Sequence, residues 1–146
     1  MHFIPYQAKY FEACMALFDE NCPAYFAENE KEDYATYLKA NQDTYMVLQN
    51  TGGAVVAAYG LAYIEEMNRA RVTWIIVSTS GQGAGIGRQM MEAVISGARE
   101  MKATAIDIAT SQHADQFFAK FGAIEIRNIK DGWGKGMHRV DMELKL

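Results

Sequence analysis

Two hydrophobic periods alternate along this chain, one of about two residues and one of about 3.6 residues. Runs of β-branched, aromatic or alternating apolar residues predict strands at 2–6, 44–49, 54–65, 72–77, 103–109, 123–129 and 138–144. Apolar residues that recur three and four positions apart predict helices at 7–21, in a less sharply bounded segment from 23 to 38, from Ile86 onward, and at 112–121. The pattern therefore predicts about seven strands and about four helices.

The order of these segments indicates the fold class. Three strands joined by short turns, the last of them ending at Val77, predict an antiparallel meander. The helix between 72–77 and 103–109 makes a β-α-β crossover, so these two strands should be parallel. Such an order predicts an α/β fold in which helices cover both faces of a mixed central sheet. The 146 residues are enough for one domain that spans 1–146.

A glycine-rich turn at residues 77–88 joins the strand at 72–77 to the helix that begins at Ile86. Backbone N–H groups at such a turn are unpaired and lie at the positive end of the helix dipole, which favours a bound phosphate. No frame matches the dinucleotide pattern G-x-G-x-x-G, and no Gly-Lys-Ser/Thr follows as in a Walker loop. Residues 82–87 instead match Gln/Arg-x-x-Gly-x-Gly/Ala. The alternative is a flexible glycine turn without a ligand.

Together with Val77-Ser78-Thr79, this pattern resembles the acyl-CoA-binding motif of the GNAT superfamily of N-acyltransferases. The segment 111–123 resembles the family's Asn-x-x-Ala-x-x-φ-Tyr-x-x-x-Gly-Phe, with Ser111 in place of the asparagine and Phe118 in place of the tyrosine. The order of the predicted elements is also that of the GNAT fold. The resemblance covers nearly the whole chain and is most specific for residues 72–122.

The resemblance implies a single GNAT-type N-acetyltransferase domain that uses acetyl-CoA. In the family, the strands before and after the loop helix splay apart, and the pantetheine arm pairs with the first strand, here through the backbone of Val77 and Thr79. The loop amides would bind the pyrophosphate, and a Cβ at Gly85 or Gly87 would obstruct it or force strain at positive φ. The implied cofactor-binding residues are Val77, Ser78, Thr79, Gln82, Gly83, Ala84, Gly85, Ile86, Gly87, Arg88, Ser111 and Phe118.

The implied reaction is direct attack of a neutral primary amine on the acetyl thioester. No G-x-S-x-G occurs and neither cysteine lies near the motif, which agrees with a reaction without a covalent intermediate. Phe118 replaces the tyrosine that often serves the family as general acid, and Arg71 lies where the family often has a glutamate base. Glu65, Glu66 and His138 are more typical of solvated or structural positions. We therefore assign no catalytic residue from the sequence.

The acceptor pocket is expected between the first two helices, the outer part of the central strands and a lid-like glycine-rich loop at 130–136. Its candidate lining residues are Tyr25, Phe26, Tyr59, Tyr63, Arg71, Thr73, Trp133 and His138. Because aromatic side chains at such spacing also build cores, we expect about half of these residues to reach the pocket. Their types favour a small amine with apolar or aromatic parts, and Arg71 would favour a substrate carboxylate.

Two other functions stay open. One is acetylation of a protein lysine or N-terminus, and the other is a catalytically weak domain that senses acyl-CoA. Phe118 and the missing glutamate are the features that leave the sensor function open. Thiol release from acetyl-CoA with a broad panel of amines discriminates between these functions.

Composition and charge limit the classes of partner and the location that we expect for this chain. A net charge of −4 without a basic run argues against nucleic-acid binding. The first residues lack the features of a signal peptide, and no apolar run approaches the roughly 20 residues of a membrane span, so we expect a cytoplasmic protein without a membrane partner. Cys14 and Cys22 lie outside any C-x-x-C pair, and His2, His113 and His138 lack ligand spacing, so we expect reduced thiols and no metal site. Small members of the family are often dimers, but no heptad or apolar stripe indicates an interface here.

Overall fold

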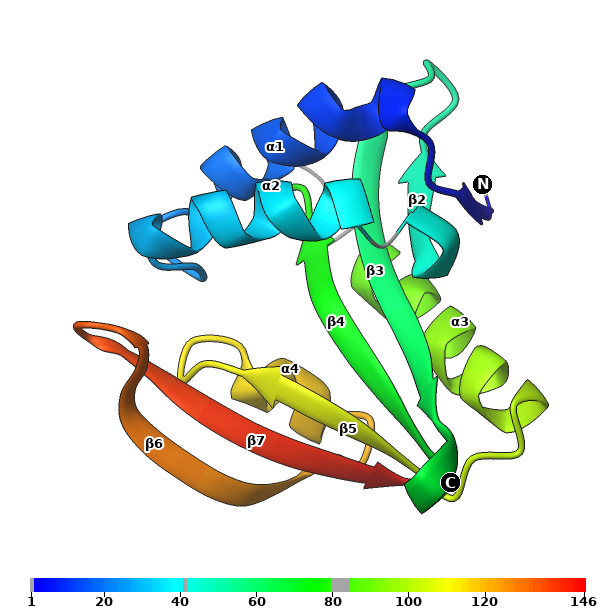
Figure 1. Ribbon diagram of the computed structural model, residues 1–146, viewed down its shortest axis with the longest axis vertical. Helices are drawn as coiled ribbons and strands as arrows, with labels where there is room; N and C mark the ends of the chain where they lie inside the picture. The colour runs from blue at the N-terminus through cyan, green and yellow to red at the C-terminus, as the bar shows by residue number, and fades with distance from the viewer. Residues whose placement is uncertain (1, 41, 80–84) are drawn as a thin grey trace.

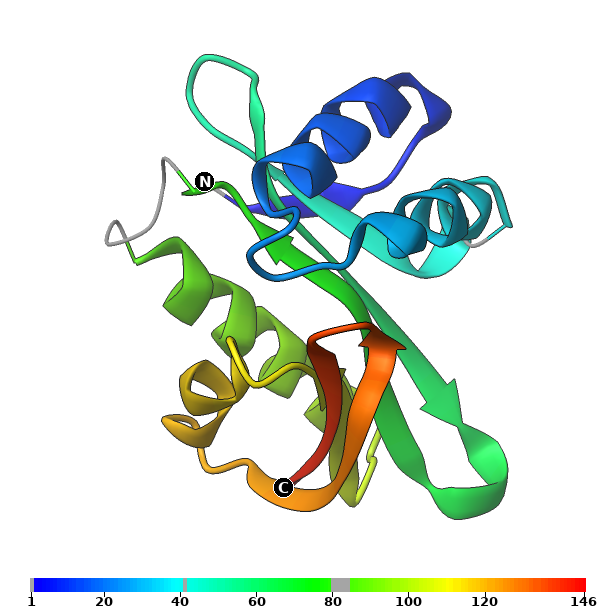
Figure 2. The same ribbon diagram turned by 90° about the vertical axis from the view of Figure 1, so that its left-hand side faces the viewer.

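One seven-stranded sheet carries helices on both of its faces (Figure 1, Figure 2). The computed structural model describes residues 2–40, 42–79 and 85–146. The strands are β1 (Phe3–Pro5), β2 (Tyr45–Gln49), β3 (Val55–Ile64), β4 (Arg69–Val77), β5 (Ala105–Thr110), β6 (Ile124–Gly134) and β7 (Met137–Lys145). The helices are α1 (Phe11–Glu20), α2 (Lys31–Ala40), α3 (Ile86–Glu100) and α4 (Asp115–Ala119), and the 3-10 turn η2 (Glu28–Glu30) precedes α2. The predicted fold class is confirmed.

The sheet has the order β1-β2-β3-β4-β5-β7-β6, so β1 and β6 are its edges. The strands β1 to β4 are antiparallel neighbours, which confirms the predicted meander. The pair β4–β5 is parallel across the crossover that contains α3, as the β-α-β unit predicts. Strand β7 pairs antiparallel with both β5 and β6.

Two hydrophobic cores lie on opposite faces of the sheet. Helix α3 buries a stripe of residues one turn apart, made of Ile86, Met90, Val94 and Ala98. It packs with α4 on one face, whereas α1 and α2 bury Phe18 and Tyr34 on the other. None of the helices in the described ranges is both long and apolar enough to cross a membrane.

Strands β4 and β5 pair over a very short length. Ala70 lies opposite Ile106 and Arg71 opposite Asp107, and beyond these pairs the strands diverge toward their C-terminal ends (Figure 1). Each strand then has a neighbour on one side only, β3 for β4 and β7 for β5. The splay that the GNAT resemblance implied is therefore present.

Strand β4 contains a bulge at Trp74. Ala58 lies opposite Ile76 and Gly60 opposite Thr73, so two residues of β4 face one residue of β3 between these pairs. Trp74 has a φ of 44°, a left-handed conformation that a bulky residue rarely adopts. The surrounding packing must hold such a conformation in place.

The segment 130–136 is not the lid-like loop that its glycines predict. It is the end of β6, which continues to Gly134, followed by the turn into β7. A Cβ on Gly132 would lie 2.4 Å from the Cβ of Arg139, so this glycine permits close strand packing rather than a turn. Gly136, with a φ of 79°, is the glycine that serves the turn itself.

Other differences concern boundaries. Helix α4 is shorter than the predicted 112–121, because the carbonyl oxygen of Ser111 accepts the N–H groups of Ala114 and Asp115 in a turn before the helix. Gly122, with a φ of 104°, ends this segment as predicted. Helix α1 begins at Phe11, after a separate 3-10 turn.

Candidate active site

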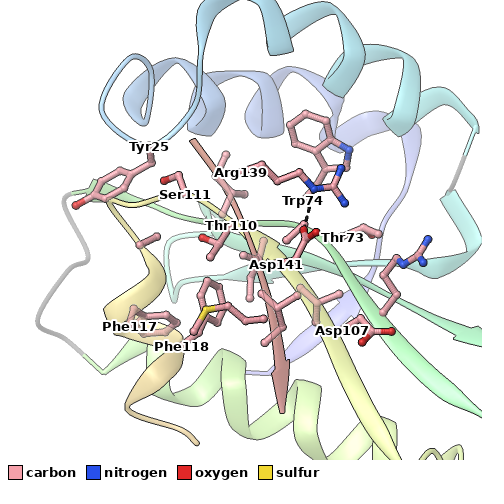
Figure 3. Close-up of a pocket in the computed structure, with 18 of the residues that line it drawn as sticks. Tyr25, Thr73, Trp74, Asp107, Thr110, Ser111, Phe117, Phe118, Arg139 and Asp141 are labelled. Carbon is pink, nitrogen blue, oxygen red and sulfur yellow. Dashed lines mark hydrogen bonds and ion pairs between the residues drawn. The ribbon is translucent and has the colours of Figure 1, made fainter. Parts of the chain in front are cut away.

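A cleft of about 1090 Å³ occupies the splay between β4 and β5 (Figure 3). Its walls come from β4, β5, β7, α4 and the first turn of α3, and on the other side from η2, the chain before it and β6. We call the end at which β4 and β5 pair its narrow end, and the end at which the two strands have diverged its wide end.

The wide end of the cleft is formed by the start of α3. Gly85 is the N-cap residue with a φ of 80°, and among the described residues no side chain caps the helix and no acidic residue lies in its first turn. The N–H groups of this turn, together with Arg88, suit a bound anion. A Cβ on Gly85 would meet nothing within 4 Å among the described residues, so those residues leave the front of α3 open. These residues fit the pyrophosphate of acetyl-CoA.

Gly87 is required for a different reason. A Cβ at this position would lie 2.9 Å from the ring of Phe117, so the glycine allows α3 to pack against α4. Ile86 is buried in the core and anchors the helix rather than lining the cleft. The predicted loop residues Gln82, Gly83 and Ala84 lie outside the described residues.

The end of β4 is bound by the end of α1. The side-chain amide of Asn21 donates to the carbonyl oxygen of Val77 at 3.0 Å, and the N–H of Thr79 donates to Glu20 at 3.2 Å. The hydroxyls of Ser78 and Thr79 donate to the same Glu20 oxygen at 3.1 and 3.0 Å. The carbonyl oxygen of Val77 and the N–H of Thr79, two of the backbone groups expected to pair with the pantetheine arm, thus already have partners in the chain. Val77 lines the cleft, whereas Ser78 and Thr79 do not.

Ser111 and Phe118 lie on the β5 side and both line the cleft. The hydroxyl of Ser111 accepts the N–H of His113 at 3.2 Å. The ring of Phe118 is buried and packs edge to face on Phe117, with 5.1 Å between ring centroids. Phe118 offers only carbon atoms to the cleft and cannot donate a proton.

At the narrow end, Arg69 joins the three strands that meet there. Its guanidinium donates to Asp107 with a shortest distance of 2.6 Å and also to the carboxylate of Glu143. These hydrogen bonds hold the pKa of Arg69 above its ordinary value. The cluster ties β4 to β5 and β7 and fixes the point from which β4 and β5 diverge.

Asp141 of β7 lies in the middle of the cleft beside Arg139 (Figure 3). One carboxylate oxygen accepts from Arg139 at 2.8 Å and the other from Arg127 at 2.8 Å. Burial alone would raise the pKa of Asp141, but the two arginines outweigh it and hold the pKa below its ordinary value. Arg71 also lines the cleft and has no hydrogen bond or ion pair within the described chain. Among the residues described, no group of three histidines, cysteines or acids could hold a metal ion.

Trp133 closes the side of the cleft that faces η2. Its indole N–H donates to the carbonyl oxygen of Thr110 at 2.7 Å, and its own carbonyl oxygen accepts from the side chain of Asn29 at 2.9 Å. The guanidinium of Arg139 lies 5.2 Å from the ring centroid. Trp133 therefore braces β6 against β5 and η2.

Trp74 and Thr73 form the β4 wall of the same region. The ring of Trp74 packs against Tyr34, Phe26 and Tyr37, with centroid distances of 4.9, 5.9 and 6.3 Å. The hydroxyl of Thr73 lies 2.6 Å from that of Tyr37. This wall is aromatic and held by contacts to α2.

The predicted acceptor residues divide into two groups. Those that line the cleft are Tyr25, Phe26, Arg71, Thr73 and Trp133. Three do not line it: Tyr59 packs in the core against Phe3, the hydroxyl of exposed Tyr63 donates to Asn68 at 2.5 Å, and the imidazole of His138 accepts a backbone N–H of the β6–β7 hairpin.

The side chains in or beside the cleft that sequence reasoning missed are mostly charged. They are Glu20, Asn21, Glu30, Asp107, Arg127, Arg139, Asp141 and Glu143. Each is a single polar residue in or beside a predicted element, and alternation along β7 was the one signal that could have marked Asp141 and Glu143 as facing the same side.

Comparisons with known proteins agree with this geometry. The sequence matches the family described as "Acetyltransferase (GNAT) domain" over residues 15–146. Ard1 from Thermoplasma volcanium has a similar structure, with a TM-score of 0.82 at 16% identity over 99% of this chain and 97% of that one. The ribosomal-protein-alanine N-acetyltransferase from Brucella melitensis has a TM-score of 0.74 at 17% identity over 100% of both chains.

A third structure, Rv2747 from Mycobacterium tuberculosis in complex with CoA, has a TM-score of 0.77 at 16% identity over 100% of this chain and 99% of that one. A search of curated proteins by sequence found no match. Structures this distant in sequence show only a shared fold, whereas the family match over residues 15–146 shows that the chain is a member of the family. The chain belongs to the GNAT acetyltransferases, which use acetyl-CoA as the acyl donor.

Proposed function

We propose that this chain transfers the acetyl group of acetyl-CoA to a primary amine of a small molecule, by direct attack of the amine on the thioester. The observation that carries the proposal is the lining of the part of the cleft that faces η2 and β6, where the acceptor would bind. It is bridged by Trp133 and lined by charged side chains of both signs. A compact polar amine fits such a site.

The start of α3 supports acetyl-CoA as the donor substrate. The N–H groups of the first turn of α3, which no side chain of residues 2–40, 42–79 or 85–146 caps, suit its pyrophosphate together with Arg88. The thioester is at the far end of the pantetheine arm from the pyrophosphate, so acetyl-CoA held at the start of α3 would place its acetyl group toward the narrow end. The acceptor then approaches from the side of η2 and β6.

Direct attack is supported by the positions of the cysteines. Neither Cys14 nor Cys22 is among the lining residues of the cleft. Burial raises the pKa of Cys14 to about 11, so its thiol stays protonated and weakly nucleophilic at neutral pH. An acetylated cysteine intermediate is therefore not part of the proposal.

The brace at Trp133 supports a small acceptor. The bridge from Asn29 through Trp133 to Thr110 crosses the side from which the acceptor enters. A protein segment lying along the cleft would have to break it, whereas a small amine can pass beside it. A protein N-terminus that enters end-on is the alternative that the experiment must separate.

The test is thiol release from acetyl-CoA with a panel of polyamines, amino acids, aryl-alkylamines and peptides. The peptides carry either a free N-terminus or a single lysine behind a blocked N-terminus. We expect kcat/KM for one small amine to exceed that for every peptide by at least about tenfold, or about 1.4 kcal/mol. Peptides as the better acceptors would overturn the small-molecule proposal. Tight CoA binding without turnover of any amine would favour a domain that senses acyl-CoA rather than an enzyme.

We also propose a cytoplasmic location. Both cysteines are free thiols, one of them buried, which supports a reducing compartment. Fractionation of cells that express the tagged chain, with thiol alkylation of the recovered protein, tests this proposal. Recovery in an oxidised or membrane-bound form would contradict it.

For the oligomeric state we propose a homodimer through β6. This edge strand is exposed along most of its length, and it presents Ile124, Ile126 and Ile129 to solvent. An exposed apolar edge favours pairing with a second strand. Sedimentation equilibrium should show a dimer that Ile124→Lys converts to a monomer, and a monomeric wild type would overturn the proposal.

A further inference from the structure

We propose that Glu30 is the general base that removes the proton from the acceptor amine, an inference that rests on the acetyl transfer proposed above. Four carboxylates line the cleft: Glu30, Asp107, Asp141 and Glu143. A direct attack needs a neutral amine, and a carboxylate beside the acceptor can accept its proton. The four carboxylates differ in their partners, and the partners decide which can do so.

Three of the four are bound to arginine. Asp107 and Glu143 share Arg69, and Asp141 accepts from both Arg127 and Arg139. A guanidinium partner stabilises the ionised carboxylate and makes it a weaker base. Glu30 has no arginine or lysine partner within the described chain.

The carboxylate of Glu30 is held at one oxygen only. Its Oε2 accepts the N–H of Ala27 at 2.8 Å, which is the backward half of a capping box at η2. Its Oε1 has no partner within the described chain, although the residue as a whole is 6% exposed. Every fully buried side-chain polar atom of the described chain has a hydrogen-bond partner, so Oε1 is accessible to solvent, and Glu30 is one of the residues that line the cleft.

The position of Glu30 is fixed by its neighbours. Tyr34 lies four residues later, on the same face of the helical turn, and its ring packs 4.9 Å from that of Trp74. Asn29 is adjacent and bonds to Trp133. Glu30 therefore lies between the β4 bulge and the Trp133 brace, on the side from which the acceptor enters.

The surroundings of Glu30 also raise its pKa above the ordinary value of a glutamate, which makes it a stronger base. Burial raises its pKa, the hydrogen bond from Ala27 opposes this, and the negative charge of Asp33 raises it further. Cys22, from the connection after α1, is a neighbouring titratable group, and Lys31 is engaged by Asp19 of α1 at 2.9 Å. On the β6 side the contacts to η2 come from Trp133 and Gly134, which are uncharged. A base whose pKa lies closer to the working pH transfers protons more effectively.

The proposed step balances as follows. The ammonium group of the acceptor gives one proton to Oε1 of Glu30 and becomes a neutral amine. The amine lone pair forms the C–N bond to the thioester carbon, and the C–S bond breaks with its electron pair on sulfur. The second proton lost from nitrogen goes to the thiolate, and Glu30 returns its proton to solvent.

The test compares Glu30→Gln with Glu28→Gln, a matched change at the exposed neighbour in the same turn. Glutamine keeps an oxygen for the Ala27 N–H, so thermal melting should show both variants folded. With the best amine of the panel, Glu30→Gln should lower kcat by about 10²–10⁴-fold and leave the KM for acetyl-CoA unchanged. In Glu30→Gln the pH profile of kcat/KM should follow the ionisation of the acceptor amine alone, whereas Glu28→Gln should keep the acidic limb of the wild type. Glu30→Asp, which keeps a carboxylate, should recover part of the activity.

The outcomes separate the two proposals. If the wild type acetylates an amine but Glu30→Gln lowers kcat by less than about threefold and keeps the acidic limb of the wild type, the role of Glu30 is overturned and the proposed function stands. If no amine is acetylated, slow hydrolysis of acetyl-CoA provides a second readout, because a base that activates an amine also activates water. Wild-type protein that releases no thiol with any amine or with water would overturn the proposed function and this inference together.

Discussion

The hydroxyl of Tyr45 donates a 2.6 Å hydrogen bond to the carbonyl oxygen of Trp74, the residue at which β4 bulges. The same hydroxyl lies 2.8 Å from the hydroxyl of Tyr34, whose ring packs against Trp74. A left-handed backbone at a non-glycine residue costs about 1–3 kcal/mol, so other contacts must stabilise it. The two buried tyrosines hold the bulge from the side of α2, near the point where β4 and β5 diverge.

Tyr45→Phe should therefore destabilise the protein by about 1–3 kcal/mol, because it leaves the buried carbonyl of Trp74 without its partner. Turnover should fall with it, while the affinity for CoA stays close to that of the wild type. Urea denaturation and calorimetry measure the two effects. Tyr6→Phe is the control, since Tyr6 packs edge to face on Tyr45 but its hydroxyl makes no hydrogen bond within the described chain. Equal stability of the two variants would contradict the role of the hydrogen bond.

The fold could be predicted because its signals are local. The apolar runs of β2 and β3, the helical stripe of α3 and the turn that begins it each depend on residues close together in sequence. Gly85 was informative for the same reason, since its left-handed φ is a property of one residue. Element order then left few topologies to consider.

Much of the site could not be predicted, because its contacts join distant residues. The bond from Thr79 to Glu20 spans 59 positions, and that from Arg69 to Glu143 spans 74. Such pairs depend on the register of strands and the placement of helices, which a single sequence does not specify. The glycines of β6 misled for a related reason: at Gly134 a Cβ would lie 2.6 Å from the side chain of Asn29, so the glycine marks close packing and not a loop.

Gly85→Glu should abolish CoA binding without unfolding the protein. The new carboxylate would occupy the open space in front of α3 and repel a phosphate at the same helix terminus. Gly53→Glu is a matched control, because Gly53 also has a left-handed φ and open space but lies in the β2–β3 turn. Calorimetry should show CoA binding lost in the first variant and kept in the second. Unchanged affinity in Gly85→Glu would contradict the assignment of the α3 terminus.

Phe118→Tyr should leave turnover equal or raise it, because the ring lines the cleft and a hydroxyl there could protonate the departing thiolate. Phe117→Tyr, on the neighbouring ring, controls for the effect of an added hydroxyl on packing. Steady-state kinetics and thermal melting should be measured on both. A collapse of turnover in a folded Phe118→Tyr would show that its buried ring has a packing role that a hydroxyl disrupts.

Stability should decline as pH rises from about 9 to about 11. Burial raises the pKa of Cys14 to about 11, opposed by a hydrogen bond with Tyr34, so the folded protein keeps a proton that the unfolded chain loses above about 9. This contribution is fully present below pH 9 and is lost as pH rises through the folded value. Urea denaturation across this range should show a shallower decline in Cys14→Ala than in the wild type. Cys22→Ala should flatten the decline less than Cys14→Ala, because the pKa of the less buried Cys22 is raised less, and equal slopes in all three proteins would refute the assignment.

Trp133→Ala should weaken the acceptor far more than the cofactor. The change removes the indole donor to Thr110 and the surface on which Arg139 lies, so it opens the side of the cleft that faces η2. The phosphate end at α3 is formed by other elements and should be unaffected. We expect KM for the acceptor to rise by about tenfold or more, or about 1.4 kcal/mol, with the Kd for CoA changed by less than about twofold. Trp133→Phe keeps the ring but loses the N–H, so it separates the hydrogen bond from the ring contact. Equal losses in acceptor and CoA affinity would show that Trp133 supports the whole cleft rather than its acceptor side.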